Sequence, residues 1–600
     1  MAAIRSRSGS RGNRRGSPGQ VGATVPPRES ARVLALALAV AAAFGPARAH
    51  AAAPLRDALV VWHDDDRHDI AEPKGRDPDL VWTGIEDTAF QPIGRLTHPG
   101  RLVRRIGTAF GGDHVPAAAN VNALDEAPNS SWFTNRIGVF PMTPDEAARG
   151  PADGAPPDRS APWTVVRAKT EGVTPGFSIR DAKGVVYFIK FDPPGDLGTA
   201  SGAAVISQRI FHAAGYNVPD DGVTTFRRDE LVLGDNVKIT LPDGTKRAMT
   251  EADLEAILAR LDQNADGSWR AITSRLLTGK PIGPFDYRGR RKDDPNDRIN
   301  HEDRRELRGL RLISAWLNHF DTKQQNSLDM FVEEGGRHSV RHHLIDFAST
   351  LGSGASGPSA RYGYEYSLDP PAIAGRILAL GLHEDAWRRV RRPTGLDEIG
   401  YFVSDPFDPI EFKPLQPNPA FANLTDRDSY WAAKIVSAFS DAHLEAIVAR
   451  AEYQNPEAAR TMTRLLAARR DKVAQYAFDR VPPLDFFVID SSGVLAFHDL
   501  GAERGIYPSA RNRYRVRATA AGADRGTGRW SAWVESETPM TRLNSGEFRE
   551  ALGEPRLGRP DEHRPPFLAL ECEVDRGAGW SRPVTVYIAR ASARIVAVER

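Results

Sequence analysis

A short polar stretch from His319 to Asn326 contains the residue types that phosphoryl-transfer chemistry requires. It carries Asp321, Lys323 and Asn326 in the order H-x-D-x-K-x-x-N, and a further carboxylate, Asp346, follows downstream. In such chemistry one carboxylate orients or deprotonates the accepting hydroxyl, while a second carboxylate and an amide oxygen hold magnesium on the phosphates. A cation offsets the charge on the moving phosphoryl group. The stretch therefore indicates a phosphoryl-transfer site if the fold brings these groups together.

The flanking sequence predicts the elements that would position this stretch. A helix is expected before it, because apolar residues recur at three- and four-residue steps up to Asn318: Leu307, Leu310, Ile313 and Leu317. The other face of this helix is filled by Arg304, Arg305, Glu306 and Arg308. After the stretch, Ser327–Val332 alternates with period two, Gly335-Gly336 marks a turn, and Val340–Phe347 is the returning strand. Asp346 is thus expected at the end of a hairpin.

The polar stretch resembles the catalytic loop of protein kinases, and Asp346-Phe347-Ala348 resembles the metal-binding D-F-G motif of that family. Phe320 stands where the family has Arg, and Ala348 stands where it has Gly. The wider layout is more similar to divergent members, such as HipA-type and secreted CotH-type kinases, than to eukaryotic protein kinases.

The resemblance implies roles for single residues and two cofactors, ATP and Mg²⁺. Asp321 would be the catalytic aspartate and Lys323 would lie near the transferred phosphate. Asn326 and Asp346 would be metal ligands, and His319 would be structural.

Three strands are expected upstream, at Trp163–Thr170, Phe177–Asp181 and Val185–Phe191. The third places Lys190 among apolar residues, where burial is costly without an anionic partner. The resemblance implies that Lys190 binds nucleotide phosphates and that Gly172 and Gly176, in the loop between the first two strands, also border the nucleotide. The alternative is an edge-strand lysine that extends its ammonium group into solvent.

A helix is predicted from Thr199 to Ala214, ending at Gly215. In kinases the corresponding helix carries a Glu that pairs with the strand lysine, but this segment contains no acid. Gln208 or Ser201 would be the polar substitutes facing inward. The missing acid leaves two hypotheses open: an active phosphotransferase, and a pseudokinase that acts as a binding or scaffold protein.

The 600 residues are too many for a single core. We predict an N-terminal extension at 52–160, a kinase-like N-lobe at 161–250, a helical C-lobe at 251–480 and a β domain at 481–600. Helices of the C-lobe are expected to begin at Pro370, Tyr430 (capped by Asp426 or Asp428), after Ser440 and at Pro456. The expected fold class is α+β, a two-lobed protein-kinase-like fold with a C-terminal all-β, sandwich-like domain.

The β domain is expected to contain seven short strands: Phe486–Ile489, Val494–Phe497, Tyr514–Ala518, Trp530–Val534, Phe567–Val574, Val584–Ala589 and Ile595–Val598. In strict alternation Trp530 and Trp533 would fall on opposite faces of their strand. The single cysteine, Cys572, is expected to be a small core hydrophobe.

The first 51 residues predict a signal peptide, with cleavage near Ala49 or Ala51. Residues 1–32 are rich in arginine, Val33–Phe44 is a short apolar run, and Ala47-Arg48-Ala49 has small residues where signal peptidase acts. An uncleaved membrane anchor is the alternative. No second long apolar segment follows, so no transmembrane segment is expected after cleavage, and the location would be periplasmic or secreted.

The overall charge bears on which class of partner the protein binds. The chain has 79 basic and 78 acidic residues, so its charges nearly balance. This balance gives no reason to expect nucleic acid. A nucleotide and an acceptor are the expected partners, and the acceptor could be a protein, an envelope component or a small molecule.

Overall fold

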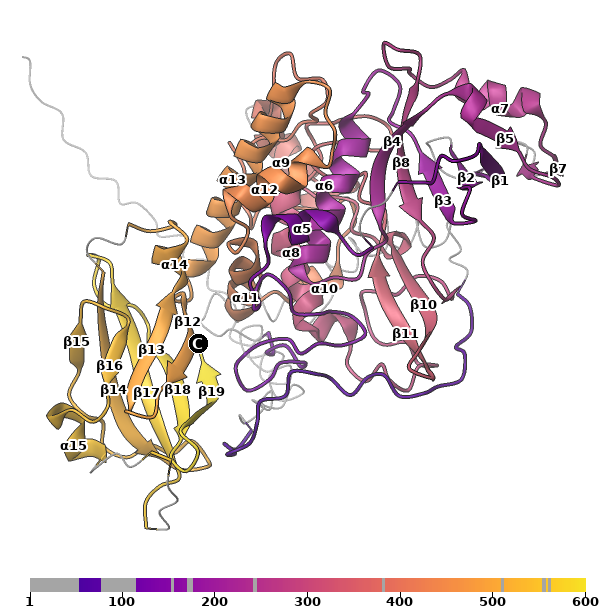
Figure 1. The fold of residues 1–600 in the computed structure, drawn as a ribbon. Coiled ribbons are helices and arrows are strands. Elements are labelled where there is room, and N and C mark those ends of the chain that lie inside the picture. The colour runs from indigo at the N-terminus through magenta and orange to yellow at the C-terminus, as the bar shows by residue number, and fades with distance from the viewer. Residues whose placement is uncertain are drawn as a thin grey trace, which may run out of the picture. The chain divides into compact units, whose positions relative to one another are not determined.

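The computed structural model describes residues 53–76, 115–152, 156–169, 176–240, 245–379, 384–508, 512–552, 557–558 and 563–600 (Figure 1). The predicted signal peptide and the loop that contains Gly172 lie outside the described residues.

A six-stranded sheet forms the N-terminal part of the body. Its strands, in spatial order, are β4 (Asp221–Phe226), β8 (Trp269–Arg275), β3 (Val186–Lys190), β2 (Gly176–Arg180), β1 (Trp163–Lys169) and β5 (Leu231–Leu233). The three predicted strands are confirmed and pair in antiparallel order. Short strands β6 (Lys238–Thr240) and β7 (Lys246–Ala248) form a separate pair beside helix α7 (Glu251–Leu258).

Alternation along β3 separates the two faces of this sheet. Tyr187 and Ile189 belong to an apolar core that also contains Leu254 and Leu258 of α7. Helix α6 (Thr199–Ala214) packs against β4 and β8, and its bounds are those predicted. Phe188 and Lys190 point away from the α7 side, because successive strand residues face opposite directions.

The central helix α8 (Arg305–Leu317) lies in the middle of the largest apolar core. It packs against α10 (Pro419–Ala422), α11 (Asp426–Val436) and α13 (Pro456–Phe478), while α12 (Asp441–Ala449) contacts α13 and α5 (Pro144–Arg149). The helices predicted at Pro370, after Ser440 and at Pro456 are confirmed, the first as α9 (Pro370–Leu378). The cap of α11 is Thr425, and Asp428 completes its capping box, so the prediction of an aspartate cap was wrong.

The face of α8 opposite its apolar stripe is also buried. Arg304, Arg305, Glu306 and Arg308 are each at most 1% exposed. Segments of the N-terminal extension and α11 supply their partners, including a 2.7 Å ion pair of Arg305 with Asp125 and a 2.8 Å ion pair with Asp428. The amphipathic pattern correctly predicted the helix. Its charged face, however, packs against other parts of the protein and is not exposed to solvent.

A hairpin follows α8, as predicted. Strand β10 (Ser327–Glu334) pairs with β11 (Arg337–Leu344) around the Gly335-Gly336 turn, and β9 (Lys280–Pro281) adds to the other edge of β10. Both turn glycines have positive φ, of 58° and 73°, a conformation that glycine adopts without penalty.

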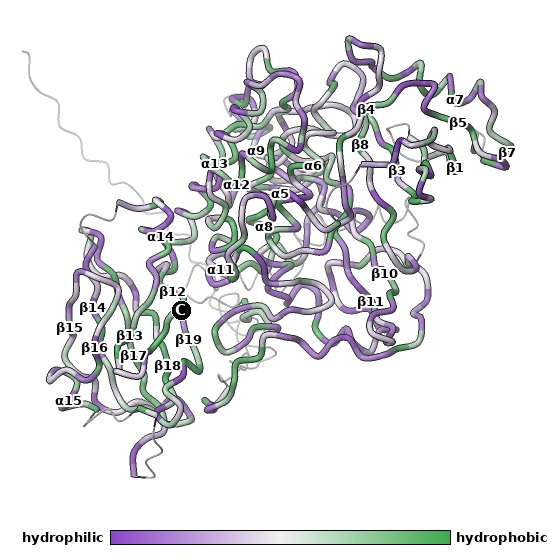
Figure 2. Tube along the Cα trace, viewed as in Figure 1, coloured by the Kyte–Doolittle hydropathy of each residue, from purple (hydrophilic) through white to green (hydrophobic). Residues whose placement is uncertain are grey.

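The C-terminal segment contains two sheets. One has the order β12-β13-β16 (Leu484–Ile489, Val494–Asp499, Met540–Arg542), and the other has the order β15-β14-β17-β18-β19 (Val534–Ser536, Arg513–Ala521, Phe567–Asp575, Val584–Ala589, Arg594–Glu599). Residues of both sheets, and buried Cys572, share one apolar core, which is a sandwich arrangement. Figure 2 shows hydrophobic residues along these strands.

Three details of this segment differ from the prediction. Two short helices, α14 (Leu500–Glu503) and α15 (Gly546–Leu552), interrupt the strands, and β16 was not predicted. Strand β15 begins only at Val534, so the strand expected at Trp530–Val534 is mostly irregular. Trp530 and Trp533 do not face opposite ways, because both rings contact the Arg517 guanidinium, at 4.8 and 4.6 Å.

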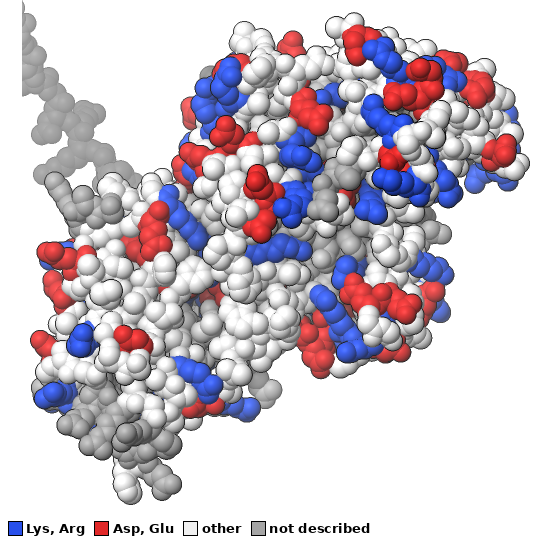
Figure 3. Space-filling model, in the orientation of Figure 1, with Lys and Arg blue, Asp and Glu red and all other residues white. Residues whose placement is uncertain are grey.

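Charged side chains of both signs are interspersed on the face drawn in Figure 3. Among the described residues, no helix combines the length and the hydrophobicity needed to cross a membrane.

Candidate active site

The structure brings Lys190 and Asp346 into direct contact. The Lys190 Nζ atom donates a 3.0 Å hydrogen bond to Asp346 Oδ1, and the two side chains are 28% and 43% exposed. Burial opposes the charged ammonium, yet attraction to Asp346, and then to Asp221, raises the pKa of Lys190 above its ordinary value. Lys190 is therefore a paired cation on the wall of a site and does not extend freely into solvent.

The polar loop folds back on Asp321. Asn326 Nδ2 donates to the Asp321 backbone oxygen at 2.8 Å and to Oδ2 at 3.0 Å. Lys323 Nζ lies 3.1 Å from the same Oδ2 atom. Because Asn326 uses its amide nitrogen on Asp321, its Oδ1 atom is the atom of that amide that can face a metal.

The hairpin joins this loop to Asp346. Ser327, the first residue of β10, pairs with Leu344, the last residue of β11, and Ile345 N donates to Asn326 O at 3.0 Å. Asp346 itself has φ of 63°, a left-handed conformation that residues other than glycine seldom adopt and that is often held in place at functional sites. The two proposed metal ligands, Asn326 and Asp346, thus leave adjacent ends of one hairpin.

Aromatic packing fixes the residues next to the loop and the acidic motif. Phe347 stacks on Phe211 of α6, with ring centroids 5.0 Å apart, and His319 contacts both rings edge-on or tilted. Burial lowers the pKa of His319. His319 is thus a buried packing residue, as the resemblance implied.

The end of α8 determines where the loop begins. Asn318 has φ of 49° and caps the helix in the left-handed conformation. The buried Arg469 side chain donates to the α8 carbonyls of Ala315 and Trp316 at 2.6 and 2.8 Å. The bond to Trp316 satisfies a carbonyl that a helix end leaves without an intrahelical partner, and the Ala315 carbonyl also accepts from Asn318 N at 3.1 Å. Arg469 was not identified from the sequence, because it is one of several arginines in the amphipathic pattern of α13.

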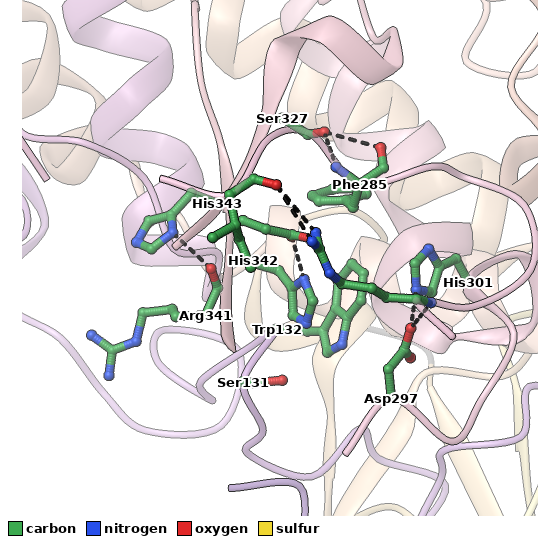
Figure 4. A network of polar contacts seen from close by, with 12 residues as sticks. Ser131, Trp132, Phe285, Asp297, His301, Ser327, Arg341, His342 and His343 are labelled. Carbon is green, nitrogen blue, oxygen red and sulfur yellow. Dashed lines mark hydrogen bonds and ion pairs between the residues drawn. The ribbon is translucent and has the colours of Figure 1, made fainter. Parts of the chain in front are cut away.

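A polar cluster holds the hairpin from its other side (Figure 4). The Trp132 ring, from the N-terminal extension, stacks on His342 of β11 with centroids 3.6 Å apart. His342 bonds Asp329 of β10 at 2.6 Å, and Arg291 bonds the other oxygen of Asp329 at 2.9 Å. Burial would raise the pKa of Asp329, but these two partners keep it below its ordinary value. The cluster is a structural support, because both oxygens of the carboxylate are bound to protein.

Lys190, Asn326 and Asp346 border a cavity of 480 Å³. Its remaining lining is mainly apolar and comes from the sheet, α6, β9 and the hairpin, including Phe188, Ala204, Ile272, Leu276, Leu277, Pro281, Leu328, Met330 and Ile345. An apolar cavity with a few convergent polar groups is the usual form of a small-molecule site. Its size is in the range that accommodates a drug-sized ligand.

Of the two glycines predicted to border the nucleotide, the structure describes Gly176. Gly176 opens β2 and pairs directly with Lys190 of β3. Gly172 lies outside the described residues.

Neither predicted substitute on α6 faces Lys190. The Ser201 hydroxyl donates to Asp192 at 2.8 Å, and Gln208 Nε2 donates to the Pro219 carbonyl at 2.7 Å. From α6, Ala204 lines the cavity instead. The expectation that Ser201 or Gln208 faces inward toward the lysine was wrong, because both side chains satisfy buried backbone or carboxylate groups elsewhere.

The donor set fits a hard divalent cation. Asp346 offers a partly exposed carboxylate and Asn326 an amide oxygen, which are the ligands Mg²⁺ prefers alongside substrate phosphates and water. Within the described part of the chain, no group of three His, Cys, Asp or Glu residues is arranged to hold a metal by itself. A metal here would therefore need the phosphates as further ligands.

No protein-family model matches the chain, and no curated protein matches it. Among solved structures, the chain is similar to the Helicobacter pylori proinflammatory kinase CtkA, with 10% identity over 53% of this chain and 98% of that one, at a TM-score of 0.27. It is also similar to the Golgi casein kinase, with Mn/ADP bound (9% identity, 54% and 75% of the two chains, TM-score 0.26) and in a second structure (8%, 54% and 74%, TM-score 0.25). Identities and TM-scores this low say nothing about activity, and the residues of the site are the evidence for function.

Proposed function

We propose that this chain is an exported kinase-like phosphotransferase that moves a phosphoryl group from Mg-ATP to an acceptor hydroxyl. The observation that carries the proposal is the 3.0 Å contact of Lys190 with Asp346 at the cavity wall, next to the Asp321, Lys323 and Asn326 cluster. These five residues come from three segments of the chain, and their types match the requirements of phosphoryl transfer.

When bound, ATP would supply the phosphoryl group and Mg²⁺ would hold its phosphates through Asn326 and Asp346. Lys190 binds phosphate oxygens by charge, and the apolar walls accommodate the base. Asp321 orients the acceptor hydroxyl and takes its proton as the new oxygen–phosphorus bond forms and the bond to ADP breaks. Lys323, 3.1 Å from Asp321, offsets negative charge on the transferred group. Asn326 keeps Asp321 in place through its two hydrogen bonds.

Export is part of the proposal and rests on the arginine-rich leader, the apolar run and the Ala47-Arg48-Ala49 sequence. ATP is scarce outside the cytoplasm, so the phosphoryl donor of an exported enzyme could be another nucleotide, and the binding test below includes GTP. Fractionation of cells that produce the full chain tests the location: cleavage near Ala49 or Ala51 with the product outside the cytoplasm supports export, and an uncleaved cytoplasmic product contradicts it.

Nucleotide binding by residues 52–600 tests the activity. Thermal unfolding is compared with ATP and magnesium, with ATP and EDTA, with GTP and magnesium, and for Asp346→Ala. A ligand that binds the folded state raises the melting temperature. A magnesium-dependent rise that disappears in Asp346→Ala supports the proposal. A well-folded sample that no nucleotide stabilises contradicts it.

The second candidate is a pseudokinase that binds an envelope protein or glycan. The observation that favours it is Ala204 at the place where an acid from α6 would face Lys190. Binding of Mg-ATP without release of ADP, for any acceptor supplied, would favour this candidate.

A further inference from the structure

Lys190 would lose Asp346 as its partner within the protein once a metal is bound. The two residues are paired in this structure, but a carboxylate that coordinates a metal is no longer available to hold an ammonium group. The nucleotide phosphates would then receive the Lys190 charge, and an acid of the protein beside the lysine would fix the direction in which the ammonium group reaches them. Helix α6 brings Ala204 to the cavity, so the partner must come from another element.

Asp221 is placed to be that partner by the register of the sheet. It is the first residue of β4, and it pairs with Ser274 of β8, which in turn pairs with Phe188 of β3. Directly paired residues share a face of a sheet, as do residues two apart on one strand. Asp221 and Lys190 therefore face the same way, and both line the 480 Å³ cavity.

The Asp221 carboxylate is buried and incompletely bonded. It is 4% exposed, and Ser274 donates a side-chain hydrogen bond to it. Its Oδ1 atom is buried without a hydrogen-bond partner among the described residues. Burial raises the pKa of Asp221 to about 6, against the opposing effects of Ser274, Lys190 and Arg209. A buried acceptor atom left open at a cavity wall is a costly arrangement, which a nearby ammonium group would relieve.

We propose that Asp221 is the residue that positions the Lys190 ammonium group on the nucleotide phosphates when Asp346 binds the metal. The acid that protein kinases carry on a helix would thus be supplied here by β4, which β8 separates from β3 in the sheet. Asp221 acts through Lys190 and touches no reacting atom. This inference rests on the proposed function and adds to it the residue that compensates for the acid-free α6.

The test is the affinity of residues 52–600 for Mg-ATP and for adenosine, measured by calorimetry. Asp221→Asn keeps the shape and removes the charge. We expect it to weaken Mg-ATP binding on the order of 10- to 100-fold, the range for losing a hydrogen bond to a charged group. Adenosine has no phosphates for Lys190 to bind, so its affinity should not change. Asp220→Asn removes the same charge one residue away and outside the cavity lining, and should leave both affinities unchanged.

A double-variant cycle separates positioning from a merely structural role. If Asp221 acts through Lys190, Asp221→Asn should have no further effect on Mg-ATP affinity in a Lys190→Gln protein. Asp221→Ser is the second variant if the asparagine does not fold. Equal weakening of adenosine and Mg-ATP, or an equal effect with and without Lys190, would overturn the inference while leaving the proposed function intact. An unmodified protein that binds neither ligand overturns both.

Discussion

The Nζ atom of Lys190 and the Oδ1 atom of Asp346 are 3.0 Å apart, although 156 positions separate the two residues in the chain. One comes from the third strand of the N-terminal sheet and the other from the end of the hairpin. Their contact brings the two parts of the site into one cavity. In the proposed function this pair is the resting arrangement of the site, in which each charge neutralises the other until phosphates and a cation bind.

Asp321→Asn should abolish transfer while sparing nucleotide binding. Removing a general base costs about 10²- to 10⁴-fold in rate, whereas Asp321 is not assigned to the nucleotide or the metal. The measurement is release of ADP from Mg-ATP, alongside the Mg-ATP melting shift. Glu333→Gln, at a 67% exposed side chain of the β10–β11 hairpin that follows the loop, is the charge-matched control. Full ADP release by Asp321→Asn would remove this residue from the mechanism.

Gly309→Ala should destabilise the fold even though it lies inside helix α8. Alanine is favoured over glycine by about 1 kcal/mol in a helix, but a Cβ atom at position 309 would lie 2.7 Å from the ring of buried Trp431. Overpacking a core costs about 1–3 kcal/mol, so packing outweighs propensity. Gly375→Ala in α9 is the control, because a Cβ atom there meets nothing within 4 Å. Thermal unfolding should show a lower melting temperature for the first variant and an equal or higher one for the second; the opposite order would mean that Trp431 can move aside.

Asp125→Asn should lower the free energy of unfolding, because it weakens the contact between the N-terminal extension and α8. The Asp125 carboxylate bonds both Arg305 and Arg427 at 2.7 Å. Removing one partner of a buried ion pair costs up to about 3–5 kcal/mol, and the 2.8 Å ion pair of Arg305 with Asp428 should reduce that cost. Asp441→Asn, which breaks a pair of Arg470 with a 76% exposed carboxylate, should cost less than about 1 kcal/mol. Urea unfolding compares the two, and equal midpoints would show that the Arg305 charge is satisfied without Asp125.

Stability should fall on mild acidification, and His212 should contribute. Burial, reinforced by Arg136 and Arg209, lowers the pKa of His212 to about 3. The unfolded chain then binds more protons than the folded one between about pH 3 and pH 6.5, so stability is full above pH 6.5 and is lost as the pH falls. From pH 6.5 to 5 this group accounts for up to about 2 kcal/mol.

The variant His212→Gln should therefore lose less stability than the unmodified protein between pH 7 and pH 5. Thermal unfolding at the two pH values measures this difference. His338→Gln, at a 46% exposed imidazole, should retain the full loss. An identical pH dependence for His212→Gln and the unmodified protein would contradict the assignment.

Local structure was largely predictable from the sequence, because its causes lie within a few residues. A short apolar run located β3, and the helix predicted to end at the Gly215 cap is α6 with its observed bounds. Turn glycines located the β10–β11 hairpin. The residues assembled around the cavity were also identifiable as candidates, because their types and order match one chemistry.

What the sequence could not show depends on contacts between distant segments. The charged face of α8 is buried because Asp125 and Asp428 lie against it, and no pattern within the helix indicates that. Trp530 and Trp533 both contact Arg517 of β14, because the segment that carries them lies alongside that strand before β15 begins at Val534. No pattern in the sequence distinguishes Asp221, and only the pairing of β4 with β8 and of β8 with β3 places it on the same face of the sheet as Lys190. The sequence by itself determined the elements and the chemical types, since those follow from local periodicity and side-chain chemistry. Which charges are buried, and which acid faces the lysine, was decided by the tertiary structure, since burial and pairing depend on what other parts of the chain lie alongside.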